Sequence, residues 1–417
     1  MGTLKDAASL EAFVRQAVAA VTVTDIHTHL FPPAHDGLLL WGVDELLIYH
    51  YLMTEMFMVA PRDLTPEKFW RLQKREQADL VWRHVFLEHG PLSEAARGLL
   101  GTLSALGMDV GRRDLGAIRR WFGRQKIESY LPRVFKMANI EYAVMTNNPF
   151  APEEARCWER GLPSLDCFKT ALRIDTLILQ WPEAAKTMRA AGYKTAAMPN
   201  AKSFAAARKF LADWAERLKP VYLAASLPPD FVYPSKAASA RVMREVILPA
   251  ARELNLPVAM MIGVRKRIHP ALGDGGDGVG IAHMETVEHL CRDCPDVKFL
   301  VTVLSRVNHH ELCVLARKFN NLHVFGCWWF CNTPSIIEEV TRMRLELLGT
   351  AFTCQHSDAR VLDQLIYKWS HARSIVAKVL ADKVCEQFEA GWRPTEEEVR
   401  RDVRSIFGGS FKDFIEK

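Results

Sequence analysis

Two histidines and an aspartate far apart in the chain have the residue types of a catalytic metal site. His27 and His29 are separated by one residue at the end of the apolar run Val21–His27, and Asp358 follows another apolar run near the carboxyl end. Side chains alternate between the two faces of a β-strand, so both imidazoles should point to the same side. Two neutral imidazoles and one carboxylate leave coordination positions open, as in catalytic sites for zinc or a similar divalent ion. The sequence therefore predicts a site for one metal ion, with zinc as the expected metal.

Other predicted strands lack the ligands that a second metal would need. Val221–Ser226 has no lysine to bridge two ions, and neither Val258–Val264 nor Val297–Leu304 contains a histidine. Asp25 lies on the same face as His27, one step deeper in its strand. It could orient a ligand imidazole, or it could be a structural carboxylate at a strand edge.

Basic residues follow several predicted strands. They are Arg173, Arg265, Lys266, Arg267, Arg306 and Arg360. The planar guanidinium group of arginine forms bidentate hydrogen bonds with a carboxylate. Arginines beside a bound cation therefore indicate a small anionic substrate. Each one alone could equally be a solvated surface residue. We assign Arg173 and Arg265 to substrate binding.

The elements that must position these residues alternate between short apolar runs and longer segments of helical period. Near-continuous apolar strands covered by helices indicate a parallel sheet, and eight such units favour a closed (β/α)8 TIM barrel over a doubly wound sheet. Closure would make the first and eighth strands neighbours and bring Asp358 to the two histidines. The eight predicted strands are Val21–His27, Tyr142–Asn147, Thr170–Ile174, Val221–Ser226, Val258–Val264, Val297–Leu304, Leu322–Trp328 and Thr350–Gln355. The clearest helical segments are Ala240–Leu256, His309–Asn321, Pro334–Leu348 and Asp363–Ala390.

One barrel over residues 1–417 accounts for the chain, with two additions. About a hundred residues separate the first two strands, far more than an ordinary connection needs. We expect a helical insertion over 31–138, rich in aromatic residues and Met, that roofs the active-site face. A separate helical domain with its own role is the alternative. A helical tail is expected over 391–417.

Bulk composition is typical of a soluble globular protein, with 49% hydrophobic and 25% charged residues. The net charge of +5 is spread along the chain, which gives no basic arm for nucleic acid. No apolar stretch approaches the ~20 residues of a membrane span, and the amino terminus does not have the pattern of a signal peptide. The odd count of nine cysteines predicts reduced thiols and a cytoplasmic protein. The oligomeric state stays open, a homo-oligomer included.

Seven short motifs occur in order over nearly the whole chain. They are His27-Thr28-His29, His50-Tyr51, Thr146-Asn147-Asn148-Pro149, Arg173-Ile174-Asp175, Ile262-Gly263, Trp328-Trp329-Phe330 and Ser357-Asp358-Ala359-Arg360. Together they make a chain that resembles the uronate (glucuronate) isomerases, a branch of the amidohydrolase superfamily. The resemblance implies a metal-dependent barrel of the amidohydrolase type. It also implies an intramolecular oxidoreductase that interconverts an aldose hexuronate, of glucuronate or galacturonate type, with its ketose isomer by metal-assisted proton transfer through an enediol.

The resemblance also implies roles for single residues. Tyr51, with His50 beside it, is the candidate acid and base. A phenol with a pKa of ~10 is a poor base at neutral pH, so the metal and arginine charges would have to favour its ionised form. The alternative is an ordinary aromatic in the core of a helical module.

Three further residues complete the set of expected functional residues. Arg360 would act beside Asp358 and stabilise oxyanion charge. Arg173 would grip substrate oxygens. Trp329 would wall the site, unless it is simply a buried aromatic at a strand end.

The chain departs from the family pattern at three places. Met260-Met261-Ile262-Gly263 stands where the family usually has a histidine, and Ser226-Leu227-Pro228-Pro229 where it has an acidic residue. Asn147 and Asn148 replace aspartates. Loss of titratable groups, chiefly at Met261 and Leu227, could change the substrate or remove the activity.

These departures keep two other functions open. A metal-dependent hydrolase or decarboxylase would need a metal-activated water and a general base, and the missing histidines of strands five and six count against it. A catalytically silent protein that binds sugar acids is the third hypothesis. The glycine-rich segment Asp274–Gly280 is expected to be a flexible loop at the barrel rim that could serve as a lid.

Overall fold

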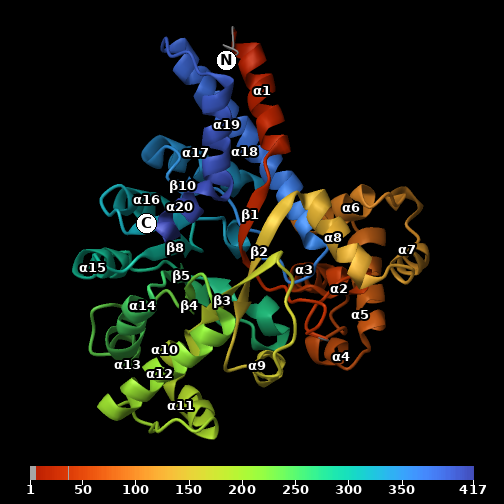
Figure 1. The fold of residues 1–417 in the computed structure, drawn as a ribbon. Coiled ribbons are helices and arrows are strands. Elements are labelled where there is room, and N and C mark those ends of the chain that lie inside the picture. The colour runs from red at the N-terminus through yellow and green to blue at the C-terminus, as the bar shows by residue number, and fades with distance from the viewer. Residues whose placement is uncertain (1–5, 36) are drawn as a thin grey trace.

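The computed structural model describes residues 6–35 and 37–417. Its centre is a parallel sheet of eight strands in the order β1-β2-β3-β4-β5-β8-β9-β10, surrounded by helices (Figure 1). The strands are β1 (Val23–Thr28), β2 (Ile140–Asn147), β3 (Phe168–Arg173), β4 (Leu223–Leu227), β5 (Val258–Ile262), β8 (Phe299–Val303), β9 (Leu322–Phe325) and β10 (Phe352–Thr353). Every predicted strand is present, and the α/β barrel prediction is confirmed.

The helices around the sheet begin and end where the local chemistry of the sequence directs. Helix α17 has Pro334 in its first turn, and the chain leaves it at Gly349, which has a φ of 60°. The elements that follow the strands are α9 (Pro152–Glu159), α10 (Asp175–Leu179), α11 (Trp181–Ala190), α12 (Ala201–Leu218), α13 (Ala238–Val242), η3 (Met243–Ile247), α14 (Leu248–Leu254), α15 (Glu285–Asp293), α16 (Asn308–Ala316), η5 (Trp329–Cys331), α17 (Pro334–Leu348) and α18 (Gln364–Glu389). Helix α1 (Ala7–Ala20) precedes the first strand and packs on α18.

Helices fill the long connection between β1 and β2, and they gather on one side of the barrel in Figure 1. They are α2 (Val43–Ile48), α3 (His50–Val59), α4 (Pro66–Trp70), α5 (Lys74–Val81), η1 (Trp82–Leu87), α6 (Glu94–Ala105), η2 (Val110–Arg112), α7 (Leu115–Phe122) and α8 (Ile127–Ala138). Helices α6 and α8 pack on α18, and α2 and α3 contact each other. The connection is therefore attached to the last helix of the barrel.

Side chains on the two faces of the strands form separate cores, as strand alternation requires. One core lies inside the barrel and includes Ile26, Val144, Met261 and Phe325. The larger core lies between the strands and the helices. A functional side chain at the carboxyl end of a strand must therefore point toward the inside of the barrel.

At the carboxyl end of the barrel, β1 and the residue after it hydrogen-bond to the segment that follows β10. There the Asp358 N–H donates to the His27 carbonyl at 3.0 Å, and the His29 N–H donates to the Ala359 carbonyl at 2.8 Å. At the other end the carboxyl-terminal tail, which consists of α19 (Glu396–Arg404), η6 (Ser405–Gly409) and α20 (Ser410–Glu416), contacts both strands. Gly408, with a φ of 128°, lies so close to Thr24 that a Cβ would be 2.6 Å from the Thr24 Cβ. The expected neighbour relation thus holds at the functional end of the barrel.

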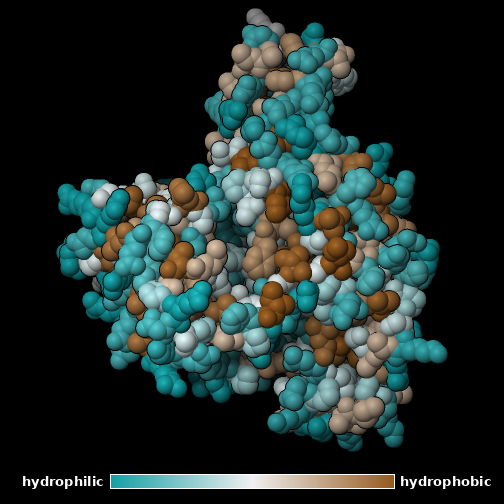
Figure 2. Space-filling model, turned by 180° about the vertical axis from the view of Figure 1, so that it is seen from behind, coloured by the Kyte–Doolittle hydropathy of each residue, from teal (hydrophilic) through white to brown (hydrophobic). Residues whose placement is uncertain are grey.

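The face drawn in Figure 2 is mainly hydrophilic, with apolar residues gathered toward its middle. None of the helices in 6–35 and 37–417 is both long and apolar enough to cross a membrane. All nine cysteines are free thiols, as predicted.

Candidate metal centre and pocket

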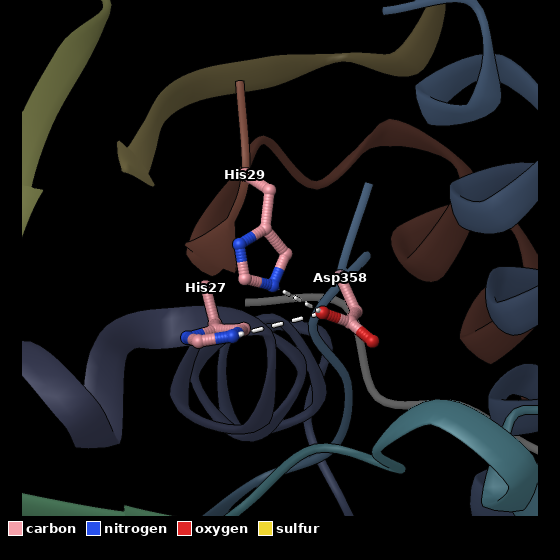
Figure 3. A group of neighbouring side chains, drawn as sticks. All are labelled: His27, His29 and Asp358. Atoms are coloured by element: carbon pink, nitrogen blue, oxygen red, sulfur yellow. Dashed lines mark ion pairs between the residues drawn. The ribbon is translucent and has the colours of Figure 1, made fainter. Parts of the chain in front are cut away.

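The three predicted metal ligands lie together at the carboxyl end of the barrel (Figure 3). The Nε2 atoms of His27 and His29 are 3.6 Å and 3.2 Å from the same carboxylate oxygen, Oδ1 of Asp358. One ligand atom from each residue lies within 4.8 Å of the others. The two imidazole planes are nearly perpendicular, at 85°. The arrangement brings together a group of side chains that could hold one ion.

The donor atoms are in the protonation states that a divalent cation requires. Burial lowers the pKa of His27 well below its usual value and also lowers the pKa of His29, so both imidazoles are neutral. Burial opposes ionisation of Asp358, but its contacts with His29 and His27 hold the pKa of its carboxyl well below its usual range. His27 Nε2 is buried and has no hydrogen-bond partner among the residues that the structure describes. These donors fit a zinc-type ion.

A neighbouring hydroxyl orients the second imidazole. His29 Nδ1 is 2.9 Å from the hydroxyl oxygen of Thr146, at the end of β2. That contact occupies one ring nitrogen and leaves Nε2 for the Asp358 side of the pocket. Thr146 belongs to one of the motifs noted in the sequence.

The segment that carries Asp358 is held in a sparsely populated backbone conformation. Asp358 has a φ of 50°, a region that aspartate tolerates better than most residues. The flanking Ser357 donates its N–H to the Asp25 carboxylate at 2.9 Å and accepts a hydrogen bond from the buried Lys368 Nζ on its carbonyl at 2.5 Å. Asp25 therefore acts on the Asp358 segment and makes no hydrogen bond to a ligand imidazole. Lys368 was not found in the sequence, because a lysine in a long helix looks like a surface residue.

A cavity of about 270 Å³ opens over the metal ligands. Of the predicted functional residues, His50, Arg173, Trp329 and Arg360 line it together with the three ligands. Arg173 Nε is 2.9 Å from Asp175 Oδ2, and Arg360 Nη1 is 2.7 Å from Asp274 Oδ2. Other lining residues are Tyr49, Asn148, Asp175, Thr176, Ser226, Val264, Lys266 and Trp328. Two guanidinium groups thus share one cavity with the candidate metal site.

The structure does not bring Arg265 to this cavity. Arg265 is exposed on β6 (Val264–Arg265), which pairs with β7 (Gly278–Val279), and the next residue, Lys266, lines the cavity instead. Lys266 Nζ lies 5.7 Å from the centre of a Trp329 ring. The strand β6 ends at Arg265, and Lys266 is the first residue of the turn that follows it, so the backbone of this turn decides which side chain reaches the cavity. Arg306 is paired with Glu339 on the surface.

Tyr51 lies beside the metal cavity, in an adjoining cavity of about 260 Å³. The two cavities share Tyr49 and Trp329, and Tyr49 lines the metal cavity itself. The Tyr51 ring is 4.4 Å from the His50 ring, centre to centre. Burial raises the pKa of Tyr51 well above its usual value, and burial together with the Arg360 charge lowers the pKa of His50 to about 3. At neutral pH both side chains are uncharged.

The positions that depart from the family pattern differ in their surroundings. On β4, Leu227 belongs to the core between the sheet and the helices, and Ser226 lines the cavity. Met261 faces the inside of the barrel. Asn147 donates from Nδ2 to the buried Glu154 carboxylate at 3.0 Å, and burial raises the pKa of Glu154 to about 7. The Glu154 carboxyl group is therefore in direct hydrogen-bond contact with the Asn147 side chain.

Comparison with known proteins gives a consistent result. No family model matches the chain, and no curated protein matches it. Among solved structures, a uronate isomerase from Bacillus halodurans C-125 is 49% identical, with a TM-score of 0.97 over 100% of this chain and 98% of that one. A uronate isomerase from Thermotoga maritima is 17% identical, with a TM-score of 0.75 over 97% of both chains. A glucuronate isomerase from Caulobacter crescentus is 16% identical, with a TM-score of 0.74 over 98% of this chain and 94% of that one. The latter two share the fold.

Proposed function

The chain belongs to the uronate isomerase family, and from this premise we propose that it interconverts an aldose hexuronate with its ketose isomer. In this reaction C2 loses a proton and C1 gains one, while a hydroxyl proton passes from O2 to O1 through an enediol. No oxidant or water is consumed. The substrate is a small sugar acid of the glucuronate or galacturonate type.

The observation that carries the proposal is the sharing of one cavity by a candidate metal site and two arginines. His27, His29 and Asp358 provide the ligands, and Arg173 and Arg360 line the same space. A uronate has a carboxylate at one end and the reacting carbonyl and hydroxyl at the other. A cavity with both a metal site and guanidinium groups can hold both ends of such a molecule.

His27, His29 and Asp358 would hold a single divalent ion, for which we propose zinc. Such an ion, when bound, would withdraw electron density from a substrate oxygen and make the neighbouring C–H more acidic. The chain's own contribution is to present two neutral imidazoles and one ionised carboxylate. Met261 and Thr302, which are buried on the strands where further ligands would stand, leave the site with these three.

The arginines bind and orient the anionic substrate. Asp175 holds the Arg173 guanidinium through Nε, which leaves its two terminal nitrogens free of that bond for substrate oxygens. We assign Arg360 to the oxygens that gain negative charge in the enediol. Lys266 takes the binding role that the sequence suggested for Arg265, and Trp329 walls the cavity.

We assign the movement of protons to His50, Tyr51 and Asp358. The ionised Asp358 carboxylate is assigned the carbon-bound proton, which it takes from C2 and returns to C1. Tyr51 keeps its proton at neutral pH because its pKa is raised, so its hydroxyl acts as a donor to a substrate oxygen. That hydroxyl is buried and has no hydrogen-bond partner among the described residues. His50 is neutral and lines the metal cavity, which suits it to accept a hydrogen bond from a substrate hydroxyl.

Solvent exchange tests the function directly. The purified protein, loaded with zinc, is incubated with glucuronate or galacturonate in D2O and the sugar is followed by NMR. We expect ketose to appear and deuterium to enter at C1 or C2. Absence of both with every hexuronate tried would overturn the proposal.

A further inference from the structure

The chain between β5 and α15 crosses the rim of the barrel as a braced excursion, which we call the strap (264–280). It consists of β6, the short turn η4 (Pro270–Gly276) and β7, with β6 and β7 paired antiparallel. The Asp277 carboxylate accepts hydrogen bonds from Lys266 Nζ at 2.6 Å and from the Arg267 N–H at 2.8 Å. The strap thus has an internal brace in addition to its two short strands.

The strap is seated on the helices between β1 and β2. Trp70 donates from its indole nitrogen to the Ala271 carbonyl at 2.8 Å. Gly275 lies so close to α3 that a Cβ there would be 2.6 Å from Thr54 Cγ2 and 3.0 Å from Met53 Cε. A side chain at this position would require the Thr54 and Met53 side chains to move. The first residue of α3 is His50, so the seat lies beside the functional cavity.

This seat presents one carboxylate to the cavity arginine. Asp274 Oδ2 accepts a hydrogen bond from Arg360 Nη1 at 2.7 Å. Arg360 is also attracted by Asp358, two residues earlier in its own segment, but no hydrogen bond joins them. Two carboxylates therefore compete for one guanidinium, and the one on the strap makes the contact. Asp358 keeps one carboxylate oxygen, Oδ1, directed toward both His27 and His29.

We propose that Asp274 is a positioning residue that acts through Arg360, holding the guanidinium over the cavity and away from the metal-ligating carboxylate. The inference rests on the proposed isomerase function and deepens it. Asp274 contacts Arg360 and is not among the residues that line the metal cavity, so its effect on the site is argued through Arg360. Arginine has a long, flexible side chain, and a fixed partner removes rotamers that would place the guanidinium elsewhere.

The Asp274→Asn variant tests the proposal, because it keeps the size of the side chain and removes its charge. We expect kcat to fall about tenfold, since a misplaced catalytic group is costly. KM should not rise, because loss of a negative charge near the cavity does not weaken attraction of an anion. The side chains of Asp274 and Arg360 are 54% and 39% exposed, so their ion pair adds little stability and Tm should stay within about 2 °C.

A double-mutant cycle then shows whether Asp274 acts through Arg360. In an Arg360→Met background, with residual exchange followed over long incubations, Asp274→Asn should cause no further loss. The matched control is Asp296→Asn, which breaks a comparable surface pair with Arg252 and should leave kcat unchanged.

Equal losses in both backgrounds, or an unchanged kcat in Asp274→Asn beside an active wild type, would overturn this inference and leave the proposed function intact. A wild type that isomerises no hexuronate would instead overturn the proposed function, and this inference with it.

Discussion

Asp25 on the first strand and Ser357 beside the third metal ligand are 332 residues apart in sequence, and the Asp25 carboxylate accepts the Ser357 N–H at 2.9 Å. The other Asp25 oxygen accepts from the Trp369 indole at 2.9 Å. The first strand and the residue that follows it therefore carry two ligands, and Asp25 on this strand also holds the segment that carries the third. Since Asp358 has a left-handed backbone, this contact helps to keep it in place.

Replacement of Asp25 with Asn should weaken the metal site from a distance. In the variant an NH2 group replaces one of the two carboxylate oxygens that accept hydrogen bonds. Because residue 25 is fully buried, this mismatch should lower the free energy of unfolding by about 2 kcal/mol. Metal affinity should fall about 10- to 100-fold because the Asp358 segment is loosened. Competition with a chelator measures the affinity. An affinity equal to that of wild type would show that Asp25 is only structural.

The His27→Ala variant tests the metal ligands. Wild type should carry about one equivalent of zinc, and the variant should carry almost none, because two ligands hold zinc far less well than three. Elemental analysis after dialysis gives the stoichiometry. His310→Ala, at an exposed position, is the control and should keep its metal. Equal metal in wild type and His27→Ala would refute the assignment.

Arg173→Met should raise KM for the uronate by about 10- to 100-fold with a smaller effect on kcat, because a binding charge is lost. The Asp175 carboxylate would then lack its partner at 2.9 Å and would repel the anion. Adding Asp175→Asn should recover part of the affinity. Steady-state kinetics of wild type, Arg173→Met and the double variant measure these effects. An unchanged KM in Arg173→Met would show that Arg173 does not bind the substrate.

Tyr51→Phe should lower kcat about a hundredfold and leave KM and Tm nearly unchanged. The hydroxyl has no partner among the described residues, so its removal leaves no donor or acceptor unsatisfied. Tyr49→Phe is the matched variant, because Tyr49 lines both cavities. If Tyr49→Phe lost kcat and Tyr51→Phe kept it, the proton-transfer role would pass to Tyr49.

Glu154 should make stability depend on pH. Burial raises its pKa from 4.5 to about 7, so between these values the folded protein binds a proton that the unfolded chain has released. The free energy of unfolding should fall by about 3 kcal/mol as pH rises through this window. Glu154→Gln should remove this decline and melt a few degrees above wild type at pH 8, with little difference at pH 4.5. The neighbouring exposed Glu153→Gln is the control, and parallel melting curves for wild type and Glu154→Gln at all pH values would contradict the assignment.

Several features could be predicted from sequence because they depend on local order. Strands and helices differ in the period of their apolar residues, which can be read over about ten residues. This period predicted all eight strands. The pair His27 and His29 needed only the two-residue period of a strand to share a face. Asp358 joined them through the general geometry of a closed barrel, which the family resemblance also implied.

Other features were decided only by the tertiary structure. Whether Arg265 or Lys266 faces the cavity, and whether Tyr51 or Tyr49 lines it, depends on loop backbone angles that no short pattern specifies. The contacts of Asp274 with Arg360 and of Lys368 with Ser357 join residues whose sequence neighbours show no sign of the partner. Local periodicity determines which element forms and which face is buried. The direction of a side chain at the end of an element is determined by distant segments that pack against it, and those meet only when the barrel has formed.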